Sequence, residues 1–227
     1  MRERWPLLLF YVIAAAEIVS QFFDLHALHF VSKPLLIIVL VLYYNQSVSS
    51  VNRIFVGALV FCWMGDVFLL FEPVSGLFFM AGLGSFLIAH LFFILSYRQF
   101  QFAEDGYKGT QRVRLSFPVV LAGSGLVVVL SPRLGDLKIP VMIYALALTL
   151  MVLQSIFRLG RTSAQSFWMV FAGAILFMIS DSLLAINKFY QPISNAGVWV
   201  MSTYIAAVYS IVRGVIFHPA EINHKSY

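Results

Sequence analysis

Residues 77–97 read LFFMAGLGSFLIAHLFFILSY, a run that contains no Lys, Arg, Asp or Glu. A helix that crosses a bilayer needs about 20 consecutive, mostly apolar residues. This run has that length and that character, so we predict that it spans a membrane. Similar runs recur on both sides of it, separated by short polar segments.

The composition of the whole chain agrees with a membrane protein. Of 227 residues, 61% are hydrophobic and 11% are charged, against about 45–50% and about 25% in soluble domains. Mean hydropathy is +0.89. These values exclude a nucleic-acid-binding domain, a secreted disulfide scaffold and a soluble catalytic domain on a membrane anchor. The net charge of +5 is then explained by Lys and Arg on the cytoplasmic side of the membrane.

We predict an all-α membrane protein that forms one transmembrane domain over residues 1–227. The longest connection, 99–114, separates two groups of four spans, which suggests parallel repeats over 1–98 and 115–217. The second and fifth spans are the shortest. The eight predicted spans are 6–23, 30–44, 53–71, 77–97, 115–131, 138–157, 166–186 and 195–217.

The distribution of Lys and Arg orients these spans, because cytoplasmic loops carry an excess of both residues. The side of the termini holds Arg2, Arg4, Arg53, Arg98, Lys108, Arg112, Arg114, Arg158, Arg161, Arg213 and Lys225. The opposite side holds Lys33, Arg133, Lys138 and Lys188. Both termini are therefore expected in the cytoplasm. The first apolar segment resembles a signal peptide but continues to Phe23, so we expect no cleavage.

Proline positions bear on the choice between a carrier and an enzyme. Transporters often place substrates at helices broken by mid-span Pro or Gly. Here Pro34 and Pro118 are predicted near helix starts, where a missing N–H costs little. No proline is predicted in the middle of a span, which argues against transport.

Acidic side chains within the spans are the first functional candidates, since each costs about 2.5–3.5 kcal/mol to insert. Three qualify: Glu17, Asp66 and Asp181. Each Asp follows a small residue, and Leu69 and Leu184 follow at the same offset. In parallel repeats, Asp66 and Asp181 would lie at similar depth and could face each other. Glu17 has a simpler explanation, a hydrogen bond to a neighbouring hydroxyl.

Four further residues are candidates for the surroundings of the acids. His90 lies within a span and either packs or orients a catalytic group. By helix rise, it lies about 20 Å from the non-cytoplasmic end and Asp66 about 7 Å, so the two meet only if helices tilt. Thr203 and Tyr204 are buried hydroxyls, and Thr203 is expected to bond within its own helix. Lys33 either extends to the interface or contacts a lipid phosphate.

The chemistry available to this set is acid–base catalysis by two carboxylates. The chain has no HExxH, CxxC, GxSxG or P-loop motif, and its ligand set is too poor for Mg²⁺ or Zn²⁺. We therefore expect no metal and no cofactor. Two neighbouring acids in a low dielectric do not both ionise easily, so a proton donor stands beside a base. That arrangement suits an oxocarbenium-like transition state, which protonation of a vinyl ether also generates.

The ordered motifs resemble the YhhN-like membrane proteins, a family that includes the lysoplasmalogenases. The resemblance covers nearly the whole chain and rests on Lys33-Pro34-Leu35, Gly65-Asp66, Gly82…Phe86…His90, Ser180-Asp181 and Thr203-Tyr204. It implies hydrolysis of the vinyl ether of lysoplasmenyl-ethanolamine or -choline to a fatty aldehyde and a glycerophospho-base. It also implies that Asp66 and Asp181 match the catalytic aspartates. This chain continues with Ile205-Ala206-Ala207, where some relatives carry a Tyr and a Gln.

Two other functions remain open at this point. A proton-coupled transporter would use Asp66 and Asp181 as relays, and a non-catalytic lipid-binding or assembly protein would use them only to hold helices together. A hydrolase predicts a lateral opening and an apolar cavity that ends at both carboxylates. We expect lysophospholipid and membrane lipids as partners, no nucleic acid, no obligate protein partner, and a bacterial plasma membrane as the location.

Overall fold

The computed structural model describes residues 5–102 and 109–218, which form eight long helices and two single-turn 3₁₀ helices. In chain order the elements are α1 (Trp5–Phe22), α2 (His26–Ser47), α3 (Arg53–Leu70), α4 (Gly76–Gln99), α5 (Gly109–Leu130), η1 (Ser131–Arg133), η2 (Gly135–Leu137), α6 (Lys138–Ile156), α7 (Ala164–Phe189) and α8 (Ala196–Ile216).

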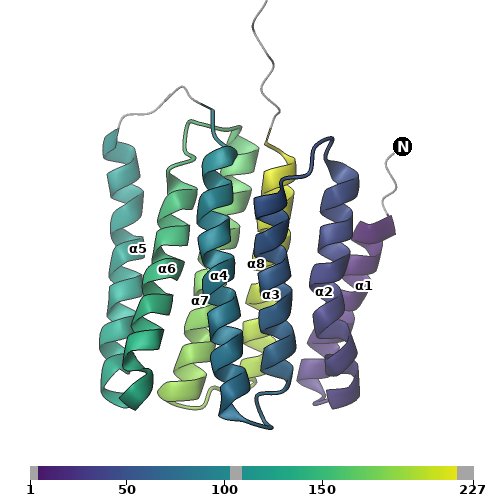
Figure 1. The fold of residues 1–227 in the computed structure, drawn as a ribbon, viewed down its shortest axis with the longest axis vertical. Helices are drawn as coiled ribbons and strands as arrows, with labels where there is room; N and C mark the ends of the chain where they lie inside the picture. The colour runs from purple at the N-terminus through teal and green to yellow at the C-terminus, as the bar shows by residue number, and fades with distance from the viewer. Residues whose placement is uncertain (1–4, 103–108, 219–227) are drawn as a thin grey trace, which may run out of the picture.

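Each of the eight long helices is long and apolar enough to cross a membrane, so the predicted class and the number of spans are confirmed. The helices stand side by side and alternate in direction, so α1 begins and α8 ends at the same end of the bundle (Figure 1). We call this the terminal end, and the other the distal end. A cytoplasmic location of the terminal end remains a prediction from the charge distribution.

The predicted positions of two prolines were wrong. Pro34 and Pro118 lie inside α2 and α5 rather than at their starts, because both helices begin several residues earlier than the apolar runs. In lipid every backbone polar group needs an internal partner, so a helix continues through a proline that costs it one hydrogen bond. The positions of the prolines therefore do not argue against a transporter.

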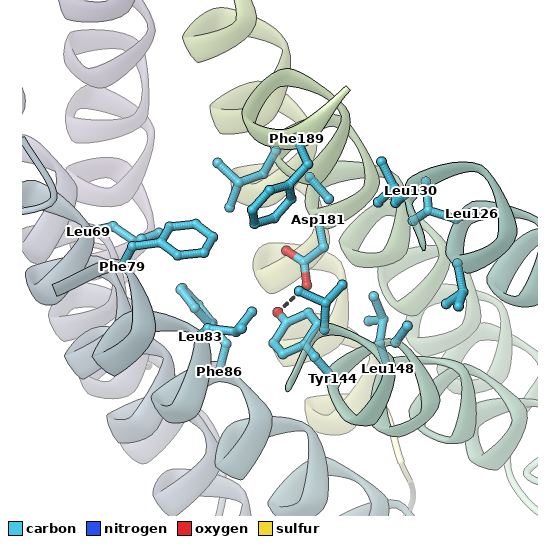
Figure 2. Close-up of a pocket in the computed structure, with 15 residues that line it drawn as sticks. Leu69, Phe79, Leu83, Phe86, Leu126, Leu130, Tyr144, Leu148, Asp181 and Phe189 are labelled. Atoms are coloured by element: carbon cyan, nitrogen blue, oxygen red, sulfur yellow. Dashed lines mark hydrogen bonds between the residues drawn. The ribbon is translucent and has the colours of Figure 1, made fainter. Parts of the chain in front are cut away.

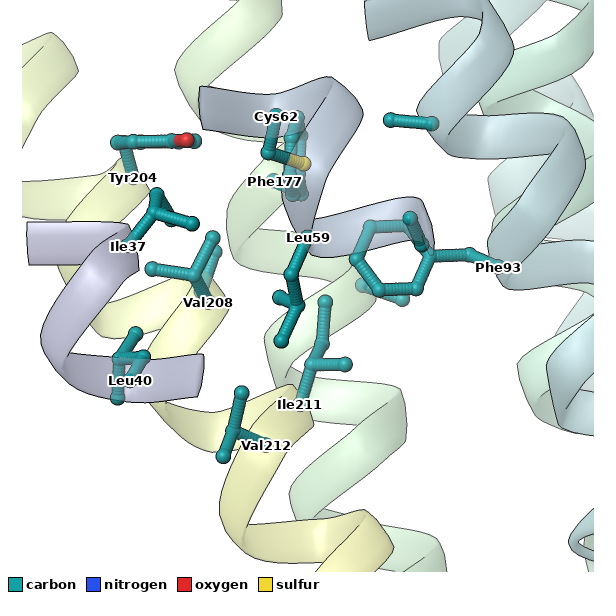
Figure 3. Close-up of a cluster of buried hydrophobic side chains, with 14 of the residues drawn as sticks. Ile37, Leu40, Leu59, Cys62, Phe93, Phe177, Tyr204, Val208, Ile211 and Val212 are labelled. Carbon is teal, nitrogen blue, oxygen red and sulfur yellow. The ribbon is translucent and has the colours of Figure 1, made fainter. Parts of the chain in front are cut away.

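The order of helix packing is the same in the two groups of four. Helix α3 packs on α4 as α7 packs on α8, and α4 packs on α6 as α8 packs on α2. Apolar side chains from α2, α3, α4, α7 and α8 fill the interior between these helices (Figure 3). Parallel repeats over 1–98 and 115–217 remain a proposal that this order favours.

Helices α7 and α8 approach so closely that one position has no room for a side chain. A Cβ added to Gly173 would lie 2.8 Å from the carbonyl oxygen of Ala207 and 2.9 Å from the backbone nitrogen of Ile211. Nearer the distal end, the hydroxyl of Ser180 donates to the carbonyl oxygen of Val200 at 3.0 Å. These contacts determine how α7 and α8 present their polar residues to each other.

We expect Gly173→Ala to lower the free energy of unfolding by about 1–3 kcal/mol, because the methyl group forces two backbones apart. Gly125→Ala is the matched control, since nothing lies within 4 Å of a Cβ at Gly125. There alanine should stabilise the helix by about 0.5–1 kcal/mol. Thermal unfolding of the two purified variants in one detergent measures the difference. Equal melting temperatures would contradict the close approach of α7 and α8.

Candidate active site

The two intramembrane aspartates each accept a hydrogen bond from a tyrosine of another helix. Asp66 on α3 is 1% exposed, and its Oδ2 accepts from the hydroxyl of Tyr204 on α8 at 2.7 Å. Asp181 on α7 accepts from the hydroxyl of Tyr144 on α6 at 2.5 Å. Both acids lie nearer the distal ends of their helices than the terminal ends. The two pairs are alike in chemistry but use four different helices.

His90 on α4 lies beside the second pair rather than the first. Its Nε2 is 3.8 Å from Oδ2 of Asp181, and its ring packs edge-on against that of Tyr144 at 5.1 Å between centroids. Within the described parts of the chain, neither ring nitrogen of His90 has a hydrogen-bond partner. The difference in depth between His90 and Asp66 that the span limits indicated therefore needs no helix tilt, because the acid beside His90 is Asp181, which lies further from the distal end of its helix than Asp66 does.

Aromatic rings connect the two acid–tyrosine pairs into one cluster. Phe177 on α7 packs against Tyr204 at 5.5 Å and against His90 at 5.1 Å between ring centroids. Phe86 on α4 lies 6.0 Å from Tyr204 and 6.2 Å from Phe177. These ring contacts join the Asp66–Tyr204 pair to His90, whose ring packs against Tyr144 of the other pair.

An apolar pocket between α3, α4, α5, α6 and α7 reaches Asp181 and Tyr144 (Figure 2). Its empty space amounts to about 620 Å³ with the opening included, although only about 50 Å³ admits the centre of a water molecule. It is therefore a narrow slot. Asp181 is the one acid among the described residues that line it, and the side chains around Asp181 include Leu83, Leu148, Leu184 and Ala185.

The environments of the two aspartates differ. The side chain of Asp181 is 11% exposed and faces the apolar pocket, whereas Asp66 is enclosed and does not line it. The charge of Lys33 on α2 acts on Asp66, and so does that of Glu17 on α1. A cavity that ends at both carboxylates was expected. The pocket reaches one of them.

Glu17 belongs to a polar group between α1 and α2. It is buried, and so is Lys33 on α2. The carboxylate of Glu17 accepts from the hydroxyl of Ser32 at 2.6 Å and from the amide of Gln21 at 3.1 Å, and Nδ1 of His29 lies 2.8 Å from it. The hydroxyl bond is the one that the sequence suggested for Glu17, and it ties α1 to α2. Lys33 follows Ser32 and does not line the pocket.

Thr203 uses its hydroxyl within its own helix. The hydroxyl donates to the carbonyl oxygens of Trp199 and Val200 at 2.8 Å and 3.0 Å, which is the local arrangement that the sequence suggested. Its neighbour Tyr204 instead crosses to Asp66. The residue that sequence reasoning missed is Tyr144, which carries no signal of its own among 10 tyrosines.

Comparisons with known proteins bear on the chemistry of this site. The sequence model of the YhhN family matches residues 28–215. Human lysoplasmalogenase TMEM86B is 29% identical over 163 residues, covering 72% of this chain and 63% of the human protein. Lysoplasmalogenase of Mycobacterium tuberculosis is 34% identical over 168 residues, covering 73% and 61%.

A third relative is matched over more of its own length. Human lysoplasmalogenase TMEM86A is 30% identical over 181 residues, covering 77% of this chain and 70% of that protein. For the other two relatives, the matching region spans about three fifths of the relative's length. No solved structure matches the chain.

Proposed function

Because the chain belongs to the YhhN family, we propose that it is a lysoplasmalogenase, which hydrolyses the vinyl ether bond of a lysoplasmenyl lipid. The membership confirms the resemblance that the ordered motifs indicated. Relatives named lysoplasmalogenase come from both a bacterium and a mammal. Lysoplasmenyl-ethanolamine and lysoplasmenyl-choline are the proposed substrates, and a fatty aldehyde and a glycerophospho-base are the products.

The observation that carries this proposal is a carboxyl group at a narrow apolar slot. A hydrocarbon chain that enters the slot brings its first carbons to Asp181 and Tyr144. An apolar groove between α5 and α6 shares Val127 and Ala145 with the slot. The distal part of a long chain can leave through this groove into the bilayer. The slot therefore suits a lipid with one chain.

The proposed reaction divides the work between the two aspartates. Asp181 gives its proton to the alkene carbon next to the ether carbon, and the ether carbon becomes an oxocarbenium ion. Asp66 takes a proton from a water molecule as the water oxygen bonds to that ion. The resulting hemiacetal breaks its bond to the glycerol oxygen, and the net result is that its hydroxyl proton moves to that oxygen, so that aldehyde and alcohol are released. The proton taken by Asp66 replaces the one that Asp181 lost.

This assignment of roles follows from the two environments. A carboxylic acid surrounded by apolar side chains is favoured in its neutral form, as a proton donor requires. Asp181 lies in such surroundings at the slot. Asp66 does not line the slot, so the role left to it is that of the base. The hydroxyl of Tyr144 orients Asp181 toward the chain.

We expect Tyr144→Phe to lower kcat by about tenfold or more, because a hydrogen bond to a charged or reacting carboxyl group contributes about 1.5–3 kcal/mol. Tyr11→Phe is the control, since the hydroxyl of Tyr11 bonds only to that of Tyr209 at 2.7 Å, far from Asp181 along the chain. Initial rates of aldehyde release measure both. An unchanged kcat in Tyr144→Phe would mean that this hydroxyl does not orient the acid.

The proposed function itself is tested by aldehyde release from a lysoplasmenyl lipid by the purified protein. A lysolipid with a saturated ether is the control, because it cannot form the oxocarbenium ion by protonation of an alkene. Release from the vinyl ether alone supports the hydrolase. If the folded protein releases no aldehyde, the hydrolase is rejected. Substrate flux in sealed vesicles then tests the transporter, in which Asp66 and Asp181 act as proton relays. A bacterial plasma membrane remains the proposed location.

A further inference from the structure

The pocket-facing side of α7 continues beyond the slot to a lysine near the distal end of the helix. Asp181, Leu184 and Ala185 line the slot, and Lys188 follows at the spacing that keeps residues on one face of a helix. The side chain of Lys188 is 41% exposed and forms an ion pair with Glu72 in the turn after α3. A cation therefore stands in line with the acid, at the edge of the membrane-spanning region.

Lys188 is in contact with the wall of the slot. Its ammonium lies 5.3 Å from the ring centroid of Phe79, and Phe79 packs edge-on against Phe189 at 5.8 Å. Both phenylalanines line the slot, and Figure 2 shows Phe189 on the side of Asp181 away from Tyr144, with Phe79 across from Asp181. The ammonium group thus packs on a ring that forms part of the wall of the slot.

A second cation flanks the same end of α7. The guanidinium of Arg133 lies 3.8 Å from the ring centroid of Tyr190 and donates to the carbonyl oxygen of Tyr190 at 3.4 Å. Arg133 follows Leu130, which lines the slot. Lys188 directly precedes Phe189, and Arg133 contacts Tyr190, which directly follows Phe189. The two cations thus flank Phe189.

The distance along α7 matches the length of a lysoplasmenyl lipid. Lys188 lies seven residues after Asp181, which is about 10 Å along a helix at about 1.5 Å per residue. In the lipid, seven bonds join the alkene carbon to the phosphorus. Three bonds of an extended chain advance about 3.8 Å, so seven advance about 9 Å. A lipid with its alkene carbon at Asp181 therefore carries its phosphate to Lys188.

We infer that Lys188, assisted by Arg133, binds the phosphate of the single-chain lipid, and that Glu72 holds the ammonium group when the slot is empty of lipid. This inference rests on the proposed function for the identity of the lipid. It places the head group at the distal end of the bundle and the chain toward the middle of the membrane. It also assigns the phosphate contact to Lys188 rather than to Lys33, which is buried beside the polar group of Glu17.

The test measures binding without catalysis, by titration calorimetry on the purified protein. The probes are 1-O-hexadecyl-glycerophosphoethanolamine, 1-O-hexadecylglycerol, glycerophosphoethanolamine and inorganic phosphate. Lys188→Gln should weaken the binding of the phospholipid by about tenfold, because a charge-assisted hydrogen bond to the phosphate is lost. It should leave the affinity for hexadecylglycerol unchanged. Glu72→Gln should strengthen the binding of the phospholipid severalfold, because it frees the ammonium group of Lys188.

Arg53→Gln is the matched control, an exposed cation at the terminal end of α3. It should change the affinity for neither lipid. If Lys188→Gln lowered the affinity for both lipids equally, or for neither, the inference would be overturned. The inference would also be overturned if Lys188→Gln weakened the binding of glycerophosphoethanolamine or of inorganic phosphate by the same tenfold factor. That result would indicate a soluble anion as the ligand.

The outcome is separable from that of the proposed function. A phosphate-dependent loss in Lys188→Gln together with no aldehyde release from the vinyl ether would keep the phosphate site and reject the hydrolase. Aldehyde release with no effect of Lys188→Gln on phospholipid binding or on KM would keep the hydrolase and reject the site.

Discussion

Replacement of Asp181 by Asn should lower aldehyde release by about 10²–10⁴-fold, the usual contribution of a general acid. The amide oxygen can still accept the hydrogen bond from Tyr144, so the variant should fold and melt as the parent does. It has no acidic proton to give to an alkene carbon. Rates of aldehyde release and melting temperatures, measured on the same preparation, separate the two effects.

Asp66→Asn should give a loss of similar size, because its amide oxygen can accept from Tyr204 but cannot take a proton from water. The roles differ in what rescues them. Azide, a nucleophile that needs no base, should add to the oxocarbenium ion in Asp66→Ala and not in Asp181→Ala. The product is an α-azido ether, so this rescue is measured by mass spectrometry of the adduct rather than by aldehyde release. Formic acid should instead restore aldehyde release to Asp181→Ala and not to Asp66→Ala. Rescue of Asp181→Ala by azide would exchange the two roles, and near-parental turnover in either Asn variant would reject the mechanism.

Ala145→Phe should hinder long chains in the slot while sparing short ones. Ala145 follows Tyr144 on α6 and lines both the slot and the groove through which the chain leaves. Each buried CH₂ contributes about 0.8 kcal/mol. Displacement of two CH₂ groups from the slot should then lower kcat/KM for a hexadecenyl substrate by about tenfold.

The chain-length profile of kcat/KM is the measurement for Ala145→Phe. A butenyl substrate should be affected little, since it leaves most of the slot unfilled. Val12→Phe is the control, because Val12 is 66% exposed on α1 and faces the lipid. A uniform loss for all chain lengths in Ala145→Phe would show that the ring disturbs Tyr144 and Asp181 rather than the path of the chain.

Several properties followed from the residues in order. The eight spans follow from runs of apolar residues, because a bilayer demands about 20 of them in each helix. Asp66 and Asp181 stood out because an acid within a span is costly. The local bonds of Thr203 and the pairing of Glu17 with a hydroxyl also followed from residue type. These are properties of single segments and of their immediate chemistry.

The prolines show where reasoning from single segments failed. Apolar runs put Pro34 and Pro118 at helix starts, but α2 and α5 extend beyond those runs. Polar residues can be helical within a bundle when neighbouring helices cover them, as they cover Ser32 and Lys33. Hydropathy records the residues that lipid can solvate and not those that protein can.

The amino-acid sequence by itself determined the membrane-spanning class, the number of helices and the acids that deserve a role. Only the tertiary structure decided that Tyr144 bonds Asp181, that the slot reaches Asp181 and not Asp66, and that Lys188 packs on Phe79 in its wall. The physical reason is that helix–helix packing in lipid depends on side-chain shape between distant segments. Hydropathy is nearly the same for every face of these helices, so it cannot say which faces meet.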